Sequence, residues 1–173
     1  ESTPVVYKYN NGLVDFVRHV NASKEALFKT VGRYEGADDE LGMEVEIAFQ
    51  WNTGYNTDGI HSFANGINTI EGGMHVEGFK KSLTAVINKY ARAKGALKDK
   101  DENLQGEDIR EGLTAIIAVK LREPQFEGQT KGKLGNVSVR SLVERATNDK
   151  LAEWLEEHPA EARAAVAKAT QSA

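Results

Sequence analysis

The sequence contains no cysteine, no long apolar run and no excess of basic residues. Without cysteine the chain cannot form a disulfide scaffold, a thiol nucleophile or a thiolate zinc site, and this absence fits a cytoplasmic location. No segment approaches the ~20 apolar residues that a membrane-spanning helix requires, so we expect no membrane partner. The first four residues, Glu-Ser-Thr-Pro, lack the basic and apolar stretches of a secretory signal, and we expect them to be internal to a longer protein.

The charge and the length of the chain limit its class. The formal net charge is -4, whereas nucleic-acid-binding modules often carry a basic excess, so any DNA contact must come from a local patch. A length of 173 residues suits one domain, or one domain with a short helical extension. Such a chain buries roughly two thirds of its surface, so a stable core needs neither a disulfide nor a metal ion.

The sequence shows no self-contained chemical site. It has no Gly-x-x-x-x-Gly-Lys phosphate loop and no nucleophile elbow. Residues 99–103 begin like a calcium loop, but Leu104 stands where glycine is needed and Arg110 where the bidentate glutamate belongs. We therefore expect no metal site. The histidines are scattered and form no metal-binding pair: His19, His61, His75 and His158.

Strand patterns are clearest in two segments. Residues 43–51 alternate apolar and polar side chains, which predicts a strand with one buried face. Residues 52–59 are rich in glycine and asparagine, so we expect a hairpin loop that returns residues 60–65 as the partner strand. Residues 113–119 are almost continuously apolar, which favours a central strand covered on both faces. Weaker patterns predict strands at 5–9 and 30–34 and an acidic loop at 36–42.

Helical periodicity accounts for most of the remainder. Apolar residues recur at helical spacing at 13–20, then from Phe79 to Tyr90 in a helix that Gly95 ends, and again at 139–155. Residues 107–111 suit one helical turn. Pro159 breaks the third helix and is well placed to start a final alanine-rich helix. We expect an α+β fold, in which helices pack mainly on one face of a small mixed sheet.

Two segments carry possible chemistry. The first, at 63–79, reads FANGINTIEGGMHVEGF. Its paired glycines lead straight into a helix, whose unpaired N-terminal amides can bind an anion. The alternative is a tight strand-to-helix turn, which glycine also favours.

The second segment, at 107–131, reads EDIREGLTAIIAVKLREPQFEGQTK. It places a buried strand before a loop at 124–135, whose tip is formed by Gln129, Thr130 and Lys131. A lysine ammonium suits a phosphate oxygen, and glutamine can donate a hydrogen bond beside it. The alternative is a solvated surface loop.

These two segments resemble the transducer domain of the DNA gyrase B family, and the similarity covers almost the whole chain. It includes YKYNNGLVDFVRHVN at 7–21 and EVEIAFQWNTGY at 44–55. One departure is Met74, where the family commonly has threonine, and it removes a possible hydrogen bond at the helix start. The resemblance implies a ribosomal-protein-like two-layer fold with a left-handed crossover. It assigns residues 1–158 to the transducer domain and 159–173 to the start of a C-terminal helical extension.

The resemblance also implies a function. The family consists of ATP-dependent type II DNA topoisomerases, in which a preceding GHKL ATPase domain holds most of the ATP and its Mg2+. By position, Gln129 and Lys131 contact the γ-phosphate, Lys131 contributes to catalysis, and Lys80 faces the DNA. The implied partners are that ATPase domain, the gyrase A protein, DNA and a second copy of gyrase B in a closed clamp. We expect the isolated chain to be inactive.

A basic side on the long helix agrees with a DNA-facing wall. It consists of Lys80, Lys81, Lys89, Arg92 and Lys94, and it would contact phosphates without reading the base sequence. The alternative is a solvated face on which Glu77 supports Lys81 four residues later.

Three other functions fit less well. The equivalent domain in the ATP-hydrolysing subunit of topoisomerase IV differs in substrate preference more than in chemistry. A non-catalytic RNA- or protein-binding module of the same fold would carry a basic face, which the acidic balance opposes. A mismatch-repair or chaperone ATPase matches the Gln-Thr-Lys context less closely.

Overall fold

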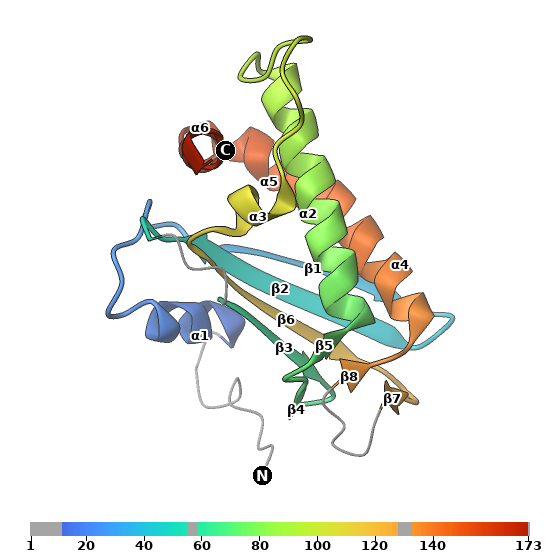
Figure 1. Cartoon of the computed structure of the whole chain (residues 1–173). Coiled ribbons are helices and arrows are strands. Elements are labelled where there is room, and N and C mark those ends of the chain that lie inside the picture. The colour runs from blue at the N-terminus through green and yellow to red at the C-terminus, as the bar shows by residue number, and fades with distance from the viewer. Residues whose placement is uncertain (1–11, 55–58, 128–132, 173) are drawn as a thin grey trace.

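The computed structural model describes residues 12–54, 59–127 and 133–172. Its centre is a five-stranded mixed sheet in the order β1-β2-β6-β3-β4 (Figure 1). All neighbouring pairs in this sheet are antiparallel except β3 and β6, which run parallel. The strands are β1 (Gly32–Asp38), β2 (Met43–Trp51), β3 (Ile60–Ala64), β4 (Ile67–Asn68) and β6 (Leu113–Lys120). The expected α+β class with a small mixed sheet is confirmed.

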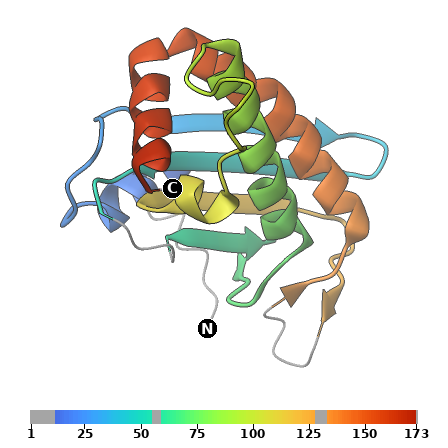
Figure 2. The ribbon, with the colours of Figure 1, turned by 45° about the horizontal axis from the view of Figure 1, so that its top comes forward.

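Most helices lie on one face of this sheet, as Figures 1 and 2 show. The long helix α2 (Met74–Ala93) follows β3 and leads through α3 (Gly106–Arg110) into β6, so it forms the crossover between two parallel strands. The hand of this crossover stays a prediction. The remaining helices on this face are α4 (Val137–Ala146), α5 (Ala152–Glu157) and α6 (Pro159–Ser172). Among the described helices, α1 (Leu13–Val20) alone packs on the opposite face.

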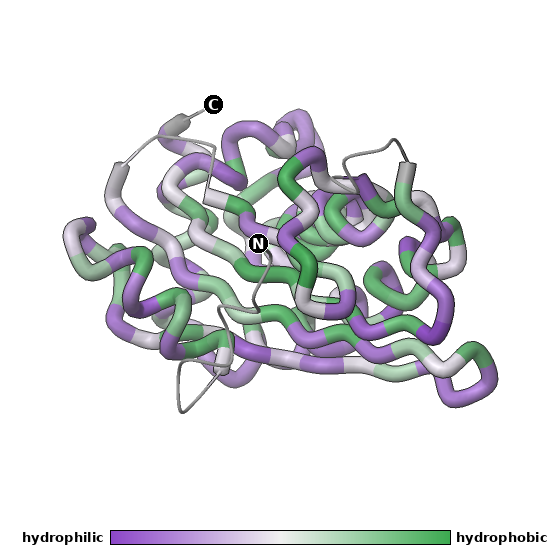
Figure 3. The backbone as a smooth tube through the Cα atoms, turned by 90° about the horizontal axis from the view of Figure 1, so that it is seen from below, coloured by the Kyte–Doolittle hydropathy of each residue, from purple (hydrophilic) through white to green (hydrophobic). Residues whose placement is uncertain are grey.

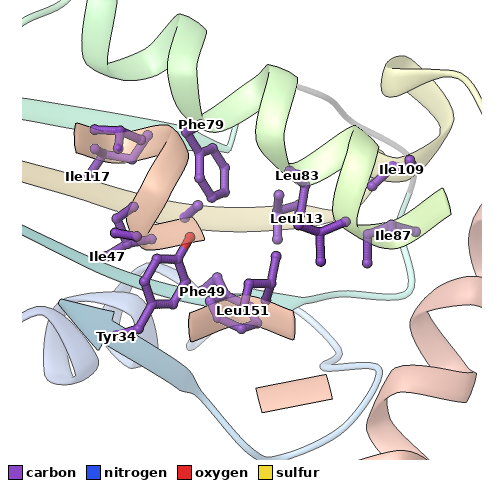
Figure 4. Close-up of a cluster of buried hydrophobic side chains, with 14 of the residues drawn as sticks. Tyr34, Ile47, Phe49, Phe79, Leu83, Ile87, Ile109, Leu113, Ile117 and Leu151 are labelled. Carbon is purple, nitrogen blue, oxygen red and sulfur yellow. The ribbon is translucent and has the colours of Figure 1, made fainter. Parts of the chain in front are cut away.

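The core follows from the alternation along β2 and the apolar run in β6. Ile47 and Phe49 belong to the same core cluster as Phe79 and Leu83 of α2, part of which is drawn in Figure 4. Ile116 points to the other face, where it packs with Leu13 and Val17 of α1. Strand β6 is therefore central and covered on both faces, as predicted. The hydropathy colouring in Figure 3 shows the same alternation of apolar and polar residues along extended segments.

The predicted hairpin between residues 43–51 and 60–65 is wrong. Strand β6 lies between β2 and β3, and it pairs with β2 in antiparallel register from Glu44↔Lys120 to Trp51↔Leu113. Turn residues indicate only that the chain changes direction, and they do not choose the neighbour. The almost wholly apolar β6 gains most by burial between two strands, whereas β3, with its polar His61 and Ser62, borders only the short β4 on its other side.

Two further boundaries differ from expectation. Strand β1 runs from Gly32 to Asp38, so the first residues of the predicted acidic loop are paired with β2. The helix predicted over 139–155 contains a π-helical turn, Thr147–Leu151, between α4 and α5. Helix α6 begins at Pro159, as predicted. Its apolar side belongs to the main core through Ala162, Ala165, Val166 and Ala169, and a domain boundary at residue 158 stays a prediction.

Candidate functional site

A second, three-stranded sheet brings the two sequence motifs together at the foot of α2 (Figure 1). Its strands are β5 (Gly72–Gly73), β7 (Phe126–Glu127) and β8 (Lys133–Leu134), in the order β5-β8-β7. The pair β5 and β8 is parallel, with Gly72 opposite Lys133 and Gly73 opposite Leu134. The glycine motif and the loop motif are far apart in sequence, yet they share this ladder.

Glycine is required at residue 73 by both conformation and space. Gly73 has φ 132° and ψ -162°, a region that essentially only glycine occupies. A Cβ there would lie 2.9 Å from the carbonyl carbon of Leu134 and closer still to its nitrogen and oxygen. The backbone of β5 can therefore approach β8 only because residue 73 has no side chain.

Gln129 and Lys131 lie outside the described residues, whereas both sides of their loop are described. Strands β7 and β8 pair in antiparallel register, Phe126↔Leu134 and Glu127↔Lys133, so the segment 128–132 joins two strands of a hairpin. The side chain of Asn136 holds the base of this hairpin. Its Oδ1 accepts from Gln125 N at 2.6 Å, and its Nδ2 donates to Glu123 O at 3.2 Å. Asn136 is not among the residues predicted from the sequence. It stands at the N-cap of α4, where asparagine is common, but its side chain bonds the hairpin and not the helix amides.

A buried chain of hydrogen bonds lies behind β5. The hydroxyls of Ser62 and Thr69 are 2.6 Å apart, and Thr69 Oγ1 lies 3.0 Å from His75 Nε2. The three side chains come from β3, from the turn before β5 and from the first turn of α2. Burial lowers the pKa of His75 to about 4, so this imidazole is neutral at pH 7. In the part of the chain that the structure describes, His75 Nδ1 has no hydrogen-bond partner.

A polar hollow of about 560 Å³ opens beside this network. Its lining includes the exposed Lys80 on α2 and the half-buried Lys133 on β8, together with Glu71 and Glu77. The carboxylates offset the two ammonium groups, so the hollow has mixed charge. The predicted DNA-facing residue, Lys80, therefore lies close to the hairpin that carries the loop.

The predicted basic side of α2 is shorter than the sequence suggests. Arg92 binds the loop after the helix: it donates to Lys98 O at 2.9 Å, to Asp101 O at 2.8 Å and to Asn103 Oδ1 at 2.7 Å. Lys94 pairs with Glu156 at 3.0 Å, and this hydrogen bond raises the pKa of Lys94. Lys80, Lys81 and Lys89 are exposed. A DNA-facing wall would therefore rest on these three lysines.

Other chemistry is sparse. Within residues 12–54, 59–127 and 133–172, no three histidine, aspartate or glutamate side chains gather as metal ligands would. Asp101 instead accepts a hydrogen bond from Lys98 N at 2.8 Å, which orders the loop that resembles a calcium site. No helix in the described part of the chain is long and apolar enough to cross a membrane.

Two solved ATPase regions share this fold. The 43K ATPase domain of Thermus thermophilus gyrase B, solved with an aminocoumarin, superposes with a TM-score of 0.86 at 36% identity, covering 94% of this chain and 43% of that one. The ATP binding domain of topoisomerase IV from Francisella tularensis superposes with a TM-score of 0.75 at 29% identity, covering 95% and 43%.

Sequence relatives are closer. The DNA gyrase B protein of Mycobacterium tuberculosis (strain ATCC 25618 / H37Rv) is 53% identical over 96% of this chain and 24% of its own length. The DNA gyrase B protein of Streptomyces coelicolor is 52% identical over 100% of this chain and 25% of its own. The chain thus spans about a quarter of the length of these curated relatives. The sequence model of DNA gyrase B matches residues 12–173, and the chain therefore belongs to the DNA gyrase B family.

Proposed function

We propose that this chain is the transducer domain of a gyrase-type, ATP-dependent type II DNA topoisomerase. In this proposal the loop at 128–132 senses the γ-phosphate of ATP through Gln129 and Lys131. The observation that carries the proposal is the β5-β8-β7 ladder, which joins the glycine motif, the start of α2 and the loop in one unit. A contact made at the loop can therefore be transmitted to a long helix.

The energetics favour a sensor that acts with other groups. ATP and ADP differ by the phosphoryl group that Lys131 would contact, and a ligand shifts a conformational equilibrium only through differential affinity for its two states. A surface charge pair at ~4 Å has a gross Coulomb energy of about 4 kcal/mol before desolvation. Moving a population from 1:99 to 99:1 requires about 5.5 kcal/mol. Lys131 therefore needs help from Gln129 and from the pairing of two gyrase B copies.

The nucleotide itself would bind mainly to a preceding GHKL domain. The described residues of this chain offer no cluster of carboxylates suited to Mg2+, so we assign the metal to that domain and expect this chain alone to hydrolyse no ATP. The partners in the cytoplasm would be the GHKL domain, the gyrase A protein, DNA and a second copy of gyrase B that closes the clamp. The same relay would couple ATP binding to strand passage by rigid rotation of domains.

The decisive experiment compares Lys131→Ala and Lys24→Ala in the full-length protein, assembled with gyrase A and DNA. We expect the first change to lower ATP turnover by about 10²-fold, as loss of one transition-state donor does. The adenine should still bind, and Gln129→Ala should cost about tenfold or less. Lys24, an exposed lysine that follows α1, serves as the control. Unchanged turnover and unchanged preference for ATP over ADP in Lys131→Ala would refute the sensor.

The DNA-facing role of Lys80 has its own test. Reversing one phosphate-facing charge should weaken DNA binding for all sequences and lower the slope of log affinity against log salt by about one. We expect this for Lys80→Glu in the full-length protein. Lys24→Glu, an exposed lysine that follows α1, is the control. Equal slopes for Lys80→Glu and the wild type would exclude Lys80 from the DNA path.

A further inference from the structure

The buried Ser62–Thr69–His75 chain connects three elements that meet at the loop-bearing sheet. Ser62 lies on β3, whose neighbour is the central strand β6. Thr69 lies in the turn before β5, and its carbonyl oxygen accepts from Gly72 N at 2.9 Å. His75 lies in the first turn of α2. These hydrogen bonds thus link the main sheet, β5 and the long helix through residues that are almost fully buried: Ser62 is 4% exposed, Thr69 2% and His75 0%.

Strand β5 depends on these side chains because its own pairing is short. It contributes only Gly72 and Gly73 to the ladder with β8. A two-residue strand of glycines has no side chains to pack and only a few backbone hydrogen bonds, so its register is weakly specified. The Thr69 hydroxyl and the Thr69–Gly72 turn fix where β5 starts. The position of β5 in turn fixes β8, which carries the hairpin.

The chemistry of the hydrogen-bonded Ser62, Thr69 and His75 side chains suits a positioning role better than a packing role. A buried hydroxyl and imidazole stabilise a fold only when they are paired, and an unpaired buried group costs stability. Here the Thr69 hydroxyl is paired on both sides, yet His75 Nδ1 has no partner among the described residues. An apolar pair would fill the same space without that cost. What only the polar chain supplies is a directional link between the Thr69 turn and α2.

We infer that Thr69 and His75 are positioning residues for the β5-β8-β7 sheet, and that through this sheet they set how well the protein discriminates a nucleoside triphosphate from the diphosphate. This inference rests on the proposed function, because it presumes that the loop contacts the terminal phosphate. Thr69 and His75 act through β5 and β8 and touch no nucleotide. Their substitution should therefore loosen the β5-β8-β7 sheet before it destabilises the main sheet.

The test uses Thr69→Val and Thr69→Ser in the full-length protein. Valine keeps the shape of threonine and removes the hydroxyl, whereas serine keeps the hydroxyl. Thr147→Val is the matched control, because Thr147 is also fully buried, its hydroxyl bonds the Tyr34 hydroxyl at 2.8 Å, and Tyr34 lies on β1 at the opposite edge of the sheet. His75→Leu, which fills the buried site without a hydrogen-bonding atom, breaks the same link from the other side and provides a second variant if Thr69→Val fails to fold.

Two measurements are made on each variant. Hydrogen–deuterium exchange of peptides covering residues 70–76 and 126–136 reports the β5-β8-β7 sheet without nucleotide. Relative affinities for a non-hydrolysable ATP analogue and for ADP report discrimination. We expect Thr69→Val to speed exchange in both peptides and to lower the preference for the triphosphate about three- to tenfold, the effect of one lost hydrogen bond. His75→Leu should act in the same direction as Thr69→Val, whereas Thr69→Ser and Thr147→Val should stay close to wild type in both measurements.

The outcomes separate this inference from the proposal on which it rests. Unchanged exchange in Thr69→Val, or equal changes in Thr147→Val, would overturn the positioning role. Faster exchange with an unchanged triphosphate preference would overturn the link to nucleotide discrimination, and if Lys131→Ala also left that preference unchanged, the sensor itself would be wrong. Faster exchange with lost preference in Thr69→Val, together with recovery in Thr69→Ser, supports the inference.

Discussion

Substitution of Gly73 by alanine tests the close approach of β5 and β8. The φ and ψ angles of Gly73 lie in a region that costs other residues about 1–3 kcal/mol. The added Cβ would also collide with the backbone of Leu134, which cannot move aside as a flexible side chain can. Overpacking of this kind typically costs about 1–3 kcal/mol. We therefore expect Gly73→Ala to lower the free energy of unfolding by about 2–6 kcal/mol, a large part of the stability of a typical domain.

The neighbouring residue provides the control. Gly72 also has a positive φ, 81°, but a Cβ there would meet only Val76 at 3.7 Å, an ordinary contact. Gly72→Ala should therefore cost only the conformational penalty, about 1–2 kcal/mol. Urea denaturation followed by the fluorescence of the buried Trp51 and Trp154 measures both variants. Equal destabilisation by the two substitutions would show that β5 does not lie against β8 as described.

Three further predictions concern the core and the loop after α2. His75 takes up a proton near pH 6.5 in the unfolded state and only near pH 4 in the folded state, so the folded protein loses stability as the pH falls through this window. From pH 8 to 5 the free energy of unfolding of the wild type should fall by about 2 kcal/mol relative to that of His75→Gln, measured by urea denaturation. Parallel pH curves for the two proteins would refute this. Tyr34→Phe leaves the buried Thr147 hydroxyl without its partner and should lower the free energy of unfolding by about 1–2 kcal/mol, measured by thermal denaturation. The loss should be smaller in the double variant that also carries Thr147→Val. An equal or larger loss in the double variant would refute this pairing. Arg92→Met removes hydrogen bonds to three residues of the following loop, so hydrogen exchange of the amides at 98–103 should become faster, whereas Lys89→Met should leave it unchanged. The free energy of unfolding should change by less than about 1 kcal/mol. Unchanged exchange in Arg92→Met would mean that Arg92 does not order this loop.

Local patterns predicted the elements whose signal lies within the segment. The alternation at 43–51 gave β2 with the bounds the structure has, and the apolar run at 113–119 gave a central strand covered on both faces. Pro159 was a reliable helix start because its missing amide and fixed φ act locally. The pairing of β3 could not be predicted this way, because its partner β6 is chosen by burial across the whole sheet.

The candidate site was predictable in its motifs and not in its assembly. The glycines at 72–73 and the loop at 124–135 stood out as separate segments, whereas their ladder depends on the path of α2 and α4 between and beyond them. In the sequence His75 is an isolated histidine, because its partners Thr69 and Ser62 are ordinary hydroxyl residues that form no recognisable motif with it. The partners of Arg92 are equally hard to recognise in the sequence, because the oxygens that it binds are mostly backbone carbonyls, which every residue has.

The parallel pairing of β3 with β6 also constrains how the chain folds. Strand β6 follows β2 in the chain only after β3, α2 and α3, so during synthesis both strands of the β1–β2 hairpin are made before the central strand. Until then the inner edge of β2 is unpaired and offers backbone hydrogen bonds to any extended chain. Non-local pairing of this kind slows folding, because loop closure is required before the contacts form. Aggregation during synthesis should therefore begin at β2, although both edges of this strand are paired in the native protein.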